Sequence, residues 1–327
     1  MKKYIRTGIS LILALLLALA GTAAAEEGQD KIQEWTDLAR SAFESEDYAT
    51  ALAYFTLAAD AGDPRAQHMA GCQYFYGYGT EPDYEKAAEY FRMAAEQGMP
   101  ASQSVLAHQY LEGVGVEQDT AKALELFLLA AEAGEAQAQL MVGWMYDFGV
   151  GVEQDFVKAA EYYTLAAGQG IPEAQTNLGI LYEYGQGVEQ SDETAVKYYR
   201  MAADLNYAYG QARLAQMYEF GYGVDQSSEM SLKYYGLAAE QGDSMGQWGM
   251  GKAYQFGVGV DVDYEKAAEY YQLSADQEDA DGLECLGYLY LEGLGVEQST
   301  EKAIELYRMA AERGSEEAQM QLMNLGQ

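Results

Sequence analysis

The chain has 327 residues, a length typical of about two ordinary domains. Lys and Arg number 19 against 52 Asp and Glu, so the formal net charge is -33. This charge disfavours nucleic acid and anionic membrane surfaces as partners, because both are bound through clustered Lys and Arg. Hydrophobic residues make up 49% of the chain, which excludes an acidic disordered tail. The 35 glycines and 29 tyrosines are too many for an ordinary globular enzyme and indicate internal repetition.

Residues 1–25 have the pattern of a secretory signal peptide. Lys2, Lys3 and Arg6 give a positive start, residues 9–20 form an apolar run that only Ser10 interrupts, and residues 23–25 are a small-residue exit. We expect cleavage after residue 25. The alternative is an uncleaved anchor, for which the uncharged residues 8–25 are barely long enough. The sequence therefore predicts an exported protein, periplasmic or secreted, with no stable membrane insertion after cleavage.

The rest of the chain repeats every 36 residues. The first glycines of successive G-x-G tripeptides are Gly77, Gly113, Gly149, Gly185, Gly221, Gly257 and Gly293. A tyrosine recurs in the same step at Tyr74, Tyr110, Tyr146, Tyr182, Tyr218, Tyr254 and Tyr290. Another aromatic series consists of Phe55, Phe91, Phe127, Tyr163, Tyr199, Tyr235, Tyr271 and Tyr307. Several series in phase at this period predict a solenoid.

Each unit has the signals of two helices, as residues 63–98 illustrate. Pro64 suits the first turn of a helix that ends at Gly77, and Asp83 is a plausible N-cap for a second helix that Gly98 ends. We expect lengths of about 13 and 15 residues. The two aromatic series are expected to pack between the helices. Since each G-x-G follows a helix and lacks a third glycine, phosphate binding at these loops is not expected.

The unit resembles a known repeat. Helix pairs joined by G-x-G-V, followed by K-A-x-x-Y-(Y/F)-x-x-A-A-x-x-G, are similar to Sel1-like repeats, which are related to tetratricopeptide repeats. The resemblance covers residues 63–314 as seven units and implies an all-α, right-handed α-solenoid of antiparallel helix pairs. Residues 26–62 look more like a tetratricopeptide unit and are predicted to be an N-terminal cap. Residues 315–327 are predicted to be a C-terminal capping helix.

Signals of catalytic chemistry are few. The two histidines, His68 and His108, belong to no zinc or hydrolase motif, and His108 with Glu112 is expected to be a solvated helical pair. We therefore predict a protein that is not an enzyme and has no cofactor and no metal. Cys72 and Cys285 lie six units apart, a separation on the order of 50 Å in a solenoid. Each is expected to be a lone thiol, with an intermolecular disulfide as the alternative.

Variation between units points to a partner surface. By similarity to tetratricopeptide units, the first helix of each pair lines a concave groove, where the residues differ from unit to unit. The predicted partner-binding residues are Trp144, Phe148, Ile180, Tyr184, Tyr209, Phe220, Trp248, Lys252 and Phe256. Several could instead tuck against the next helix. Exposed aromatic residues at this density favour binding of a protein or peptide.

The resemblance implies a non-enzymatic scaffold or adaptor, which the signal peptide would place outside the cytoplasm. The alternative from another class is a cell-wall-related ligand binder or hydrolase, since some secreted relatives bind such compounds. The sequence offers no nucleophile–base pair for that alternative.

Overall fold

The structure is a computed structural model that describes residues 28–327, so the predicted signal peptide lies outside the described residues. Within the described part of the chain, all regular structure is helical. The chain divides into two compact units, Met1–Met145 with Gly149–Glu153, and Tyr146–Phe148 with Gln154–Gln327. We call them the N-terminal region and the C-terminal region and describe each by itself.

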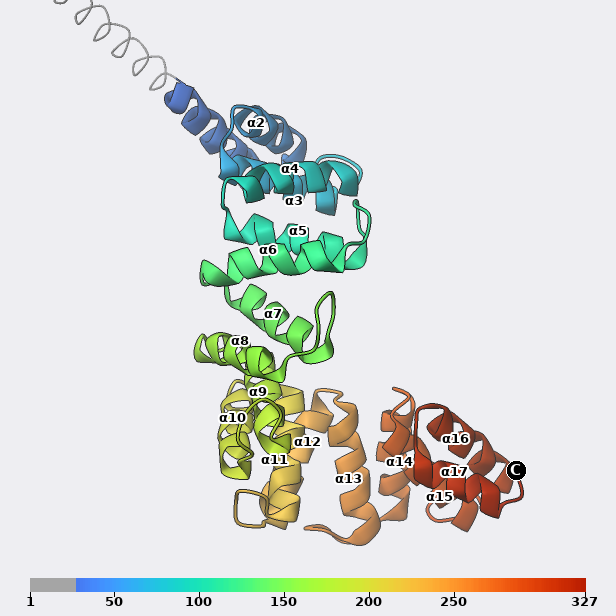
Figure 1. Ribbon diagram of the computed structural model, residues 1–327. Helices are drawn as coiled ribbons and strands as arrows, with labels where there is room; N and C mark the ends of the chain where they lie inside the picture. Colours follow the sequence, from blue (N-terminus) through green and yellow to red (C-terminus); the bar gives the residue numbers. More distant parts are fainter. Residues whose placement is uncertain (1–27) are drawn as a thin grey trace, which may run out of the picture. The chain divides into compact units, whose positions relative to one another are not determined.

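In the N-terminal region the helices between residues 48 and 132 each pack on the next helix in the chain (Figure 1). Residues 28–44 are helical. The helices that follow are α2 (Tyr48–Asp60), α3 (Pro64–Tyr76), α4 (Tyr84–Glu96), α5 (Pro100–Glu112), α6 (Thr120–Glu132) and α7 (Ala136–Phe148). The division between the regions falls inside α7.

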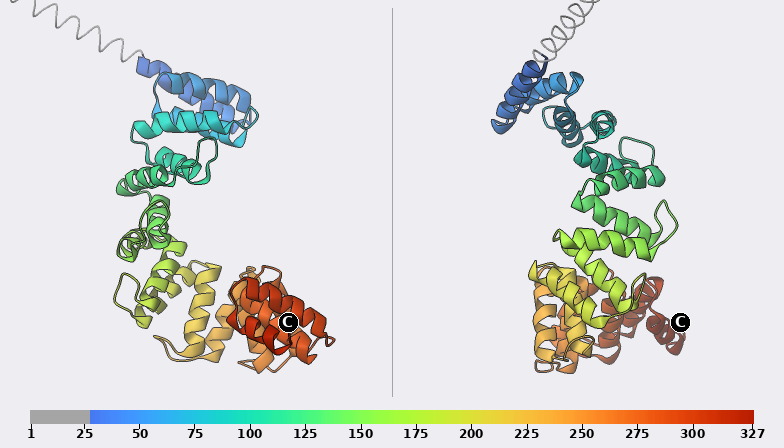
Figure 2. Two further views of the ribbon diagram at one scale, coloured as in Figure 1. Left: turned by 45° about the vertical axis from the view of Figure 1, so that its right-hand side comes forward. Right: turned by 60° about the vertical axis from the view of Figure 1, so that its left-hand side comes forward.

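The C-terminal region continues the same alternation, and Figure 2 shows its stacked helices from two further sides. Its helices are α8 (Phe156–Gly168), α9 (Pro172–Tyr184), α10 (Asp192–Asp204), α11 (Ala208–Phe220), α12 (Ser228–Glu240), α13 (Ser244–Phe256), α14 (Tyr264–Ala275), α15 (Ala280–Glu292), α16 (Thr300–Glu312) and α17 (Glu316–Asn324). The first helices of successive pairs also contact one another, α9 with α11, α11 with α13, and α13 with α15. They therefore form one continuous layer within this region.

The predicted boundaries of the unit over residues 63–98 are confirmed at three of the four ends. Helix α3 has Pro64 in its first turn and is followed by Gly77 at φ 73°, and the Asp83 side chain accepts a hydrogen bond from the Lys86 backbone N–H. The expected length of about 15 residues for the second helix is wrong. Helix α4 has 13 residues, because Gln97 closes the last turn and Gly98 leaves the helix at φ 81°.

The aromatic series that begins at Phe55 forms the centre of each helix pair. All eight members are between 0 and 4% exposed. Close packing requires a small residue opposite each ring, and a Cβ added at Gly71 would lie 2.7 Å from the Phe91 ring. Five tyrosines of the other series, Tyr74, Tyr146, Tyr182, Tyr218 and Tyr254, stack on a tyrosine of the following helix, with 5.7 Å between the centroids of Tyr74 and Tyr90. Packing therefore explains both series.

The G-x-G loops have a structural reason for their second glycine. Gly115 has φ 71°, and a Cβ added there would run into the backbone carbonyl of Tyr84, at the start of the second helix of the preceding unit. Gly187 makes the same approach to the backbone of Phe156. Each loop thus packs directly against the backbone of the unit before it. Only glycine permits this close approach, because it has no side chain.

Buried glutamines form a second repeated element, which the sequence analysis did not use. The Gln103 side chain donates to the Ala95 carbonyl at 3.2 Å, and the equivalent Gln139 donates to Ala131 at the same distance. These amides add a second hydrogen bond to carbonyls at the end of the preceding helix, which also accept the backbone N–H of Gly98 and of Gly134. Their recurrence every 36 residues is the signal that could have revealed them.

Candidate partner-binding surface

Four aromatic side chains stand at equivalent positions of successive first helices. Each is the last residue of its helix and is followed by a glycine in the left-handed conformation. We call them the aromatic row: Phe148 (63% exposed), Tyr184 (60%), Phe220 (45%) and Phe256 (64%). All four belong to the C-terminal region. Large apolar side chains with this much exposure, repeated in register, are typical of an interaction surface.

A buried hydrogen bond lies beside every member of the row. The preceding residue in each helix is a polar acceptor, and the hydroxyl of the buried tyrosine sixteen residues later donates to it. The pairs are Tyr163 with Asp147 (3.1 Å), Tyr199 with Glu183 (2.6 Å), Tyr235 with Glu219 (3.0 Å) and Tyr271 with Gln255 (2.6 Å). We call these four pairs the polar ladder. These hydrogen bonds hold the last turn of each helix in place, and with it the backbone of the exposed aromatic residue.

The polar ladder explains a change in the sequence. Where the acceptor position holds Phe75 or Leu111, the buried ring is a phenylalanine, Phe91 or Phe127. Where that position is acidic or an amide, the ring is a tyrosine. From Phe91 to Tyr271 the change from Phe to Tyr along the aromatic series therefore follows the change at the residue sixteen positions earlier, whereas Tyr307 follows Leu291 and departs from this rule. The sequence contains this correlation, and it could have located the ladder.

Two cations complete the ladder. Arg213 donates to Glu183 at 2.7 Å and reaches the Tyr199 hydroxyl at 3.4 Å. Burial alone would lower the pKa of Arg213, but the surrounding tyrosine and carboxylate raise it above its ordinary value, so the guanidinium stays charged. Lys252 pairs with Glu219 at 2.6 Å.

Lys252 is one of the predicted partner-binding residues, and the structure places it inside this internal network. Its Nζ lies 5.0 Å from the Phe220 ring centroid and 4.9 Å from that of Trp248. The ammonium is thus engaged by a carboxylate and two rings. Its main contribution is to neutralise Glu219 and to position the rings.

The other predicted partner-binding residues are half-buried. Ile180 packs against the cluster that contains Tyr199 and Leu214, and Trp248 packs against the cluster around Tyr271. Tyr209 is half-buried on α11. Trp144 is half-buried on α7 and belongs to the N-terminal region, whereas the rest of the predicted set belongs to the C-terminal region.

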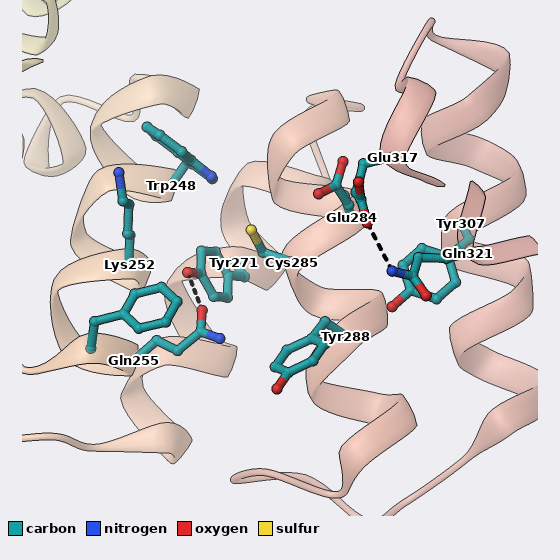
Figure 3. A pocket seen from close by; sticks show the side chains of 11 residues that line it. Trp248, Lys252, Gln255, Tyr271, Glu284, Cys285, Tyr288, Tyr307, Glu317 and Gln321 are labelled. Atoms are coloured by element: carbon teal, nitrogen blue, oxygen red, sulfur yellow. Dashed lines mark hydrogen bonds between the residues drawn. The ribbon is translucent and has the colours of Figure 1, made fainter. Parts of the chain in front are cut away.

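A groove opens at the end of the C-terminal region and encloses about 380 Å³ (Figure 3). It lies among α13, α14, α15, α16 and α17, and we call it the terminal groove. Its lining residues are Trp248, Lys252, Gln255, Phe256, Tyr271, Glu284, Cys285, Tyr288, Tyr307, Glu317 and Gln321. The predicted set did not include Tyr288, which is 42% exposed. The groove depends on how α17 closes the last unit, and periodicity does not reveal this.

The histidines have structural partners. Nδ1 of His68 lies 2.9 Å from the Ser102 hydroxyl, and burial lowers the pKa of His68. Nδ1 of His108 lies 2.9 Å from the Ser104 carbonyl, and its ring meets Phe127 edge-on. The imidazole of His108 is thus held by its own helix and a core ring.

The cysteines are unpaired thiols, and both are partly buried. Burial raises the pKa of Cys72 and that of Cys285 to about 11. Both therefore stay protonated at neutral pH and are poor nucleophiles.

Within residues 28–327, no cluster of three or more His, Cys, Asp or Glu side chains is arranged to hold a metal ion. None of the helices in the same range has the length and apolar character needed to cross a bilayer.

The stacked helix pairs, with glycine-terminated first helices and loops seated on the preceding unit, define an α-solenoid repeat protein. The chain belongs to the Sel1 repeat family, whose repeat matches residues 42–63, 64–99, 100–135, 136–171, 172–207, 208–243, 244–279 and 286–315. The first match, residues 42–63, covers the second half of the predicted N-terminal cap (residues 26–62) and one residue beyond it. Sel1 repeat proteins generally act as protein–protein interaction scaffolds and are typically non-enzymatic.

Solved structures agree with this assignment. A protective antigen of uropathogenic Escherichia coli with an SLR fold is 35% identical at a TM-score of 0.76; the match covers 93% of this chain and 66% of that one. The chain thus spans just under two thirds of that relative. A Sel1 repeat protein from Oxalobacter formigenes is 32% identical at a TM-score of 0.69, with 92% of this chain and 90% of that one covered. No curated protein matches the chain.

Proposed function

We propose that the chain is an exported, non-enzymatic scaffold that binds a protein or peptide partner through the aromatic row. The observation that carries this proposal is the exposure of four rings, 45–64%, at one repeated position. Each ring follows a residue that the polar ladder fixes, so little conformational freedom is lost on binding. Aromatic side chains with few rotatable bonds are favoured anchors at protein interfaces.

Export rests on residues 1–25, whose pattern is that of a cleaved signal peptide. The test is expression in the native host followed by fractionation and mass spectrometry of the N-terminus. We expect a protein that starts at Glu26 in the periplasm or the medium. Recovery of the uncleaved chain from the cytoplasm would remove this part of the proposal.

Partner binding is tested by capture from the envelope fraction of the native host. The variant F148A/Y184A/F220A removes three rings of the row, and we expect it to lose the captured partner. The matched control is L57A/L129A/L165A, which removes three apolar side chains that are 45–52% exposed on second helices. Retention of every partner by the row variant, or equal loss in the control, would contradict the assignment of the row.

A further inference from the structure

The terminal groove combines aromatic walls with a carboxylate rim (Figure 3). Phe256 (64% exposed) and Tyr288 (42%) present rings from α13 and α15. Glu284 of α15 and Glu317 of α17 bring their carboxylates to the same cavity. Rings beside carboxylates suit an organic cation, which is attracted to the ring faces and pairs with the oxygens.

The charge that the groove presents is negative. Its single cation, Lys252, is paired with Glu219, which does not line the cavity. Glu284 and Glu317 have no such counter-ion within the lining. Burial, and then the repulsion from Asp281 and Glu317, raises the pKa of Glu284. A cation placed between the two glutamates would relieve this repulsion, whereas an acidic ligand would increase it.

Several polar groups of the lining still have hydrogen-bonding capacity. Glu284 accepts from the Ser315 hydroxyl through Oε2, and Glu317 accepts from Gln321 through Oε1, so each carboxylate has a second oxygen that neither bond uses. The indole N–H of Trp248 is buried beside the Cys285 thiol, a weak acceptor, and meets no oxygen or nitrogen acceptor. A ligand with both a cationic donor and a carbonyl acceptor would satisfy the carboxylates and the indole together.

Tyr307 supplies a further group of this kind. It is 1% exposed and lines the groove. The other tyrosines of its series, Tyr163 to Tyr271, donate to the residue sixteen positions earlier, but that position is Leu291 for Tyr307. Leu291 offers no acceptor. The last unit therefore breaks the polar ladder and leaves a buried hydroxyl at the edge of the cavity.

We propose that the terminal groove binds an arginine side chain of the protein or peptide partner. The guanidinium has five donors for Glu284, Glu317 and the Tyr307 hydroxyl oxygen, and its plane stacks on rings such as Tyr288. The backbone carbonyl of the same ligand segment accepts from the Trp248 indole. The proposal rests on the proposed scaffold function and adds the chemistry of one specificity pocket. Arginine fits better than lysine because a point charge on a flexible stem neither stacks nor bridges two carboxylates.

The test uses the mature chain from Glu26 onward and the peptide acetyl-Gly-Ser-Phe-Arg-Phe-Ser-Gly-amide as the probe. The chain has three tryptophans, Trp35, Trp144 and Trp248, so an indole-selective nitrogen-15 NMR spectrum gives one signal for each. A Trp248→Phe variant assigns the signal of the groove. We expect the peptide to shift the Trp248 signal in a saturable way and to leave that of Trp35 unchanged.

Two comparisons isolate the charge. A peptide with citrulline in place of arginine keeps the shape without the charge, and we expect it to bind at least tenfold more weakly. The variant E284Q/E317Q should also lose at least tenfold in affinity, while its amides can keep the packing of the rim. The control E125Q/E161Q removes the same charge from exposed positions of α6 and α8 and should bind as the unaltered chain does.

The proposal is overturned if the arginine peptide leaves the Trp248 signal in place, if citrulline binds equally well, if an Asp peptide binds better, or if E284Q/E317Q has no effect. The scaffold function is tested separately by F148A/Y184A/F220A, because none of these three residues lines the terminal groove. If the row variant still captures every partner but the arginine peptide binds, the proposed role of the aromatic row is refuted and that of the terminal groove is supported. If capture depends on the aromatic row but the arginine peptide does not bind, only the proposed role of the terminal groove is refuted.

Discussion

The α5–α6 pair of the N-terminal region and the α9–α10 pair of the C-terminal region share a backbone but differ in their interiors. In the first pair the two positions hold Leu111 and Phe127, whose side chains cannot form a hydrogen bond. Their equivalents in the second, Glu183 and Tyr199, form a hydrogen bond of 2.6 Å that Arg213 completes. Helix boundaries and loops in this repeat are therefore the same whether the interior of the pair is apolar or polar. What the polar interior adds is a fixed charge arrangement beneath the exposed rings.

The largest expected effect comes from removing one member of the polar interior. In Glu183→Leu the guanidinium of Arg213, whose side chain is 10% exposed, loses its carboxylate. We expect a loss of about 3–5 kcal/mol in the free energy of unfolding, because an uncompensated charge stays buried. Urea unfolding followed by circular dichroism measures it.

The matched control converts the whole site to the chemistry of the N-terminal region. E183L/Y199F/R213M places Leu, Phe and Met where Leu111, Phe127 and Met141 stand two units earlier. This triple variant should recover most of the stability that Glu183→Leu loses. If Glu183→Leu alone is neutral, the ion pair is not the element that distinguishes the two regions.

The next-largest effect is expected at the loop glycines, which have the same backbone conformation in both regions. Gly115→Ala and Gly187→Ala should each cost about 2–4 kcal/mol, because both combine a positive φ with a clash against the preceding unit. Gly98→Ala is the control, since its φ is also positive but its added Cβ meets nothing within 4 Å. Thermal unfolding of the three variants should show nearly equal losses for the loop glycines and a smaller one for Gly98. Unequal losses at Gly115 and Gly187 would mean that the backbone is not equivalent.

A smaller effect is expected from adding a hydroxyl to the dry interior. Phe127→Tyr places an O–H opposite Leu111, which offers no acceptor, and should cost about 1–3 kcal/mol. The double variant L111Q/F127Y supplies the acceptor that Gln255 provides for Tyr271 and should recover part of the loss. Denaturant unfolding compares the two. Equal stability of Phe127→Tyr and the unaltered chain would show that the N-terminal interior admits water.

The smallest effect is a dependence on pH that originates in the C-terminal region. Burial raises the pKa of Asp147, Asp243, Asp281 and Glu284. A raised pKa in the folded state means that the folded chain binds protons more tightly than the unfolded chain, so stability rises as the pH falls from 7 towards the ordinary values of 3.8 and 4.5.

We expect these carboxylates to contribute a gain below about 1 kcal/mol between pH 7 and pH 5. His68 acts in the opposite direction over this range, because burial lowers its pKa and the unfolded chain therefore takes up the proton first. Exposed Asp263, whose pKa is lowered by its hydrogen bond from the Lys266 N–H, also opposes the gain. Relief of the net charge of -33 acts in the direction of the gain. Urea unfolding at the two pH values measures the change, and Asp147→Asn should reduce it. An unchanged pH dependence in Asp147→Asn would contradict the contribution of this buried carboxylate.

The sequence predicted the period, the helix pairs and their glycine ends because these are set by local backbone requirements. Gly77 and Asp83, for example, act within one or two turns of their own position. Which concave residues are exposed depends on packing between units. Phe148 and Phe256 are open, whereas Ile180 and Trp248 are half-buried against clusters of the next helices. The pairing of Lys252 with Glu219 and the terminal groove depend on side-chain geometry across units, which a single unit's pattern does not contain.

The seating of each G-x-G loop on the unit before it has a consequence for how such chains change length. The contact joins equivalent positions one period apart, so every junction between units is made of the same two surfaces. Gain or loss of a whole 36-residue segment, wherever it begins, re-creates a junction of this kind. Segments of any other length would place a side chain where the loop needs none. The second glycine therefore makes the 36-residue segment the natural unit of insertion and deletion in this protein.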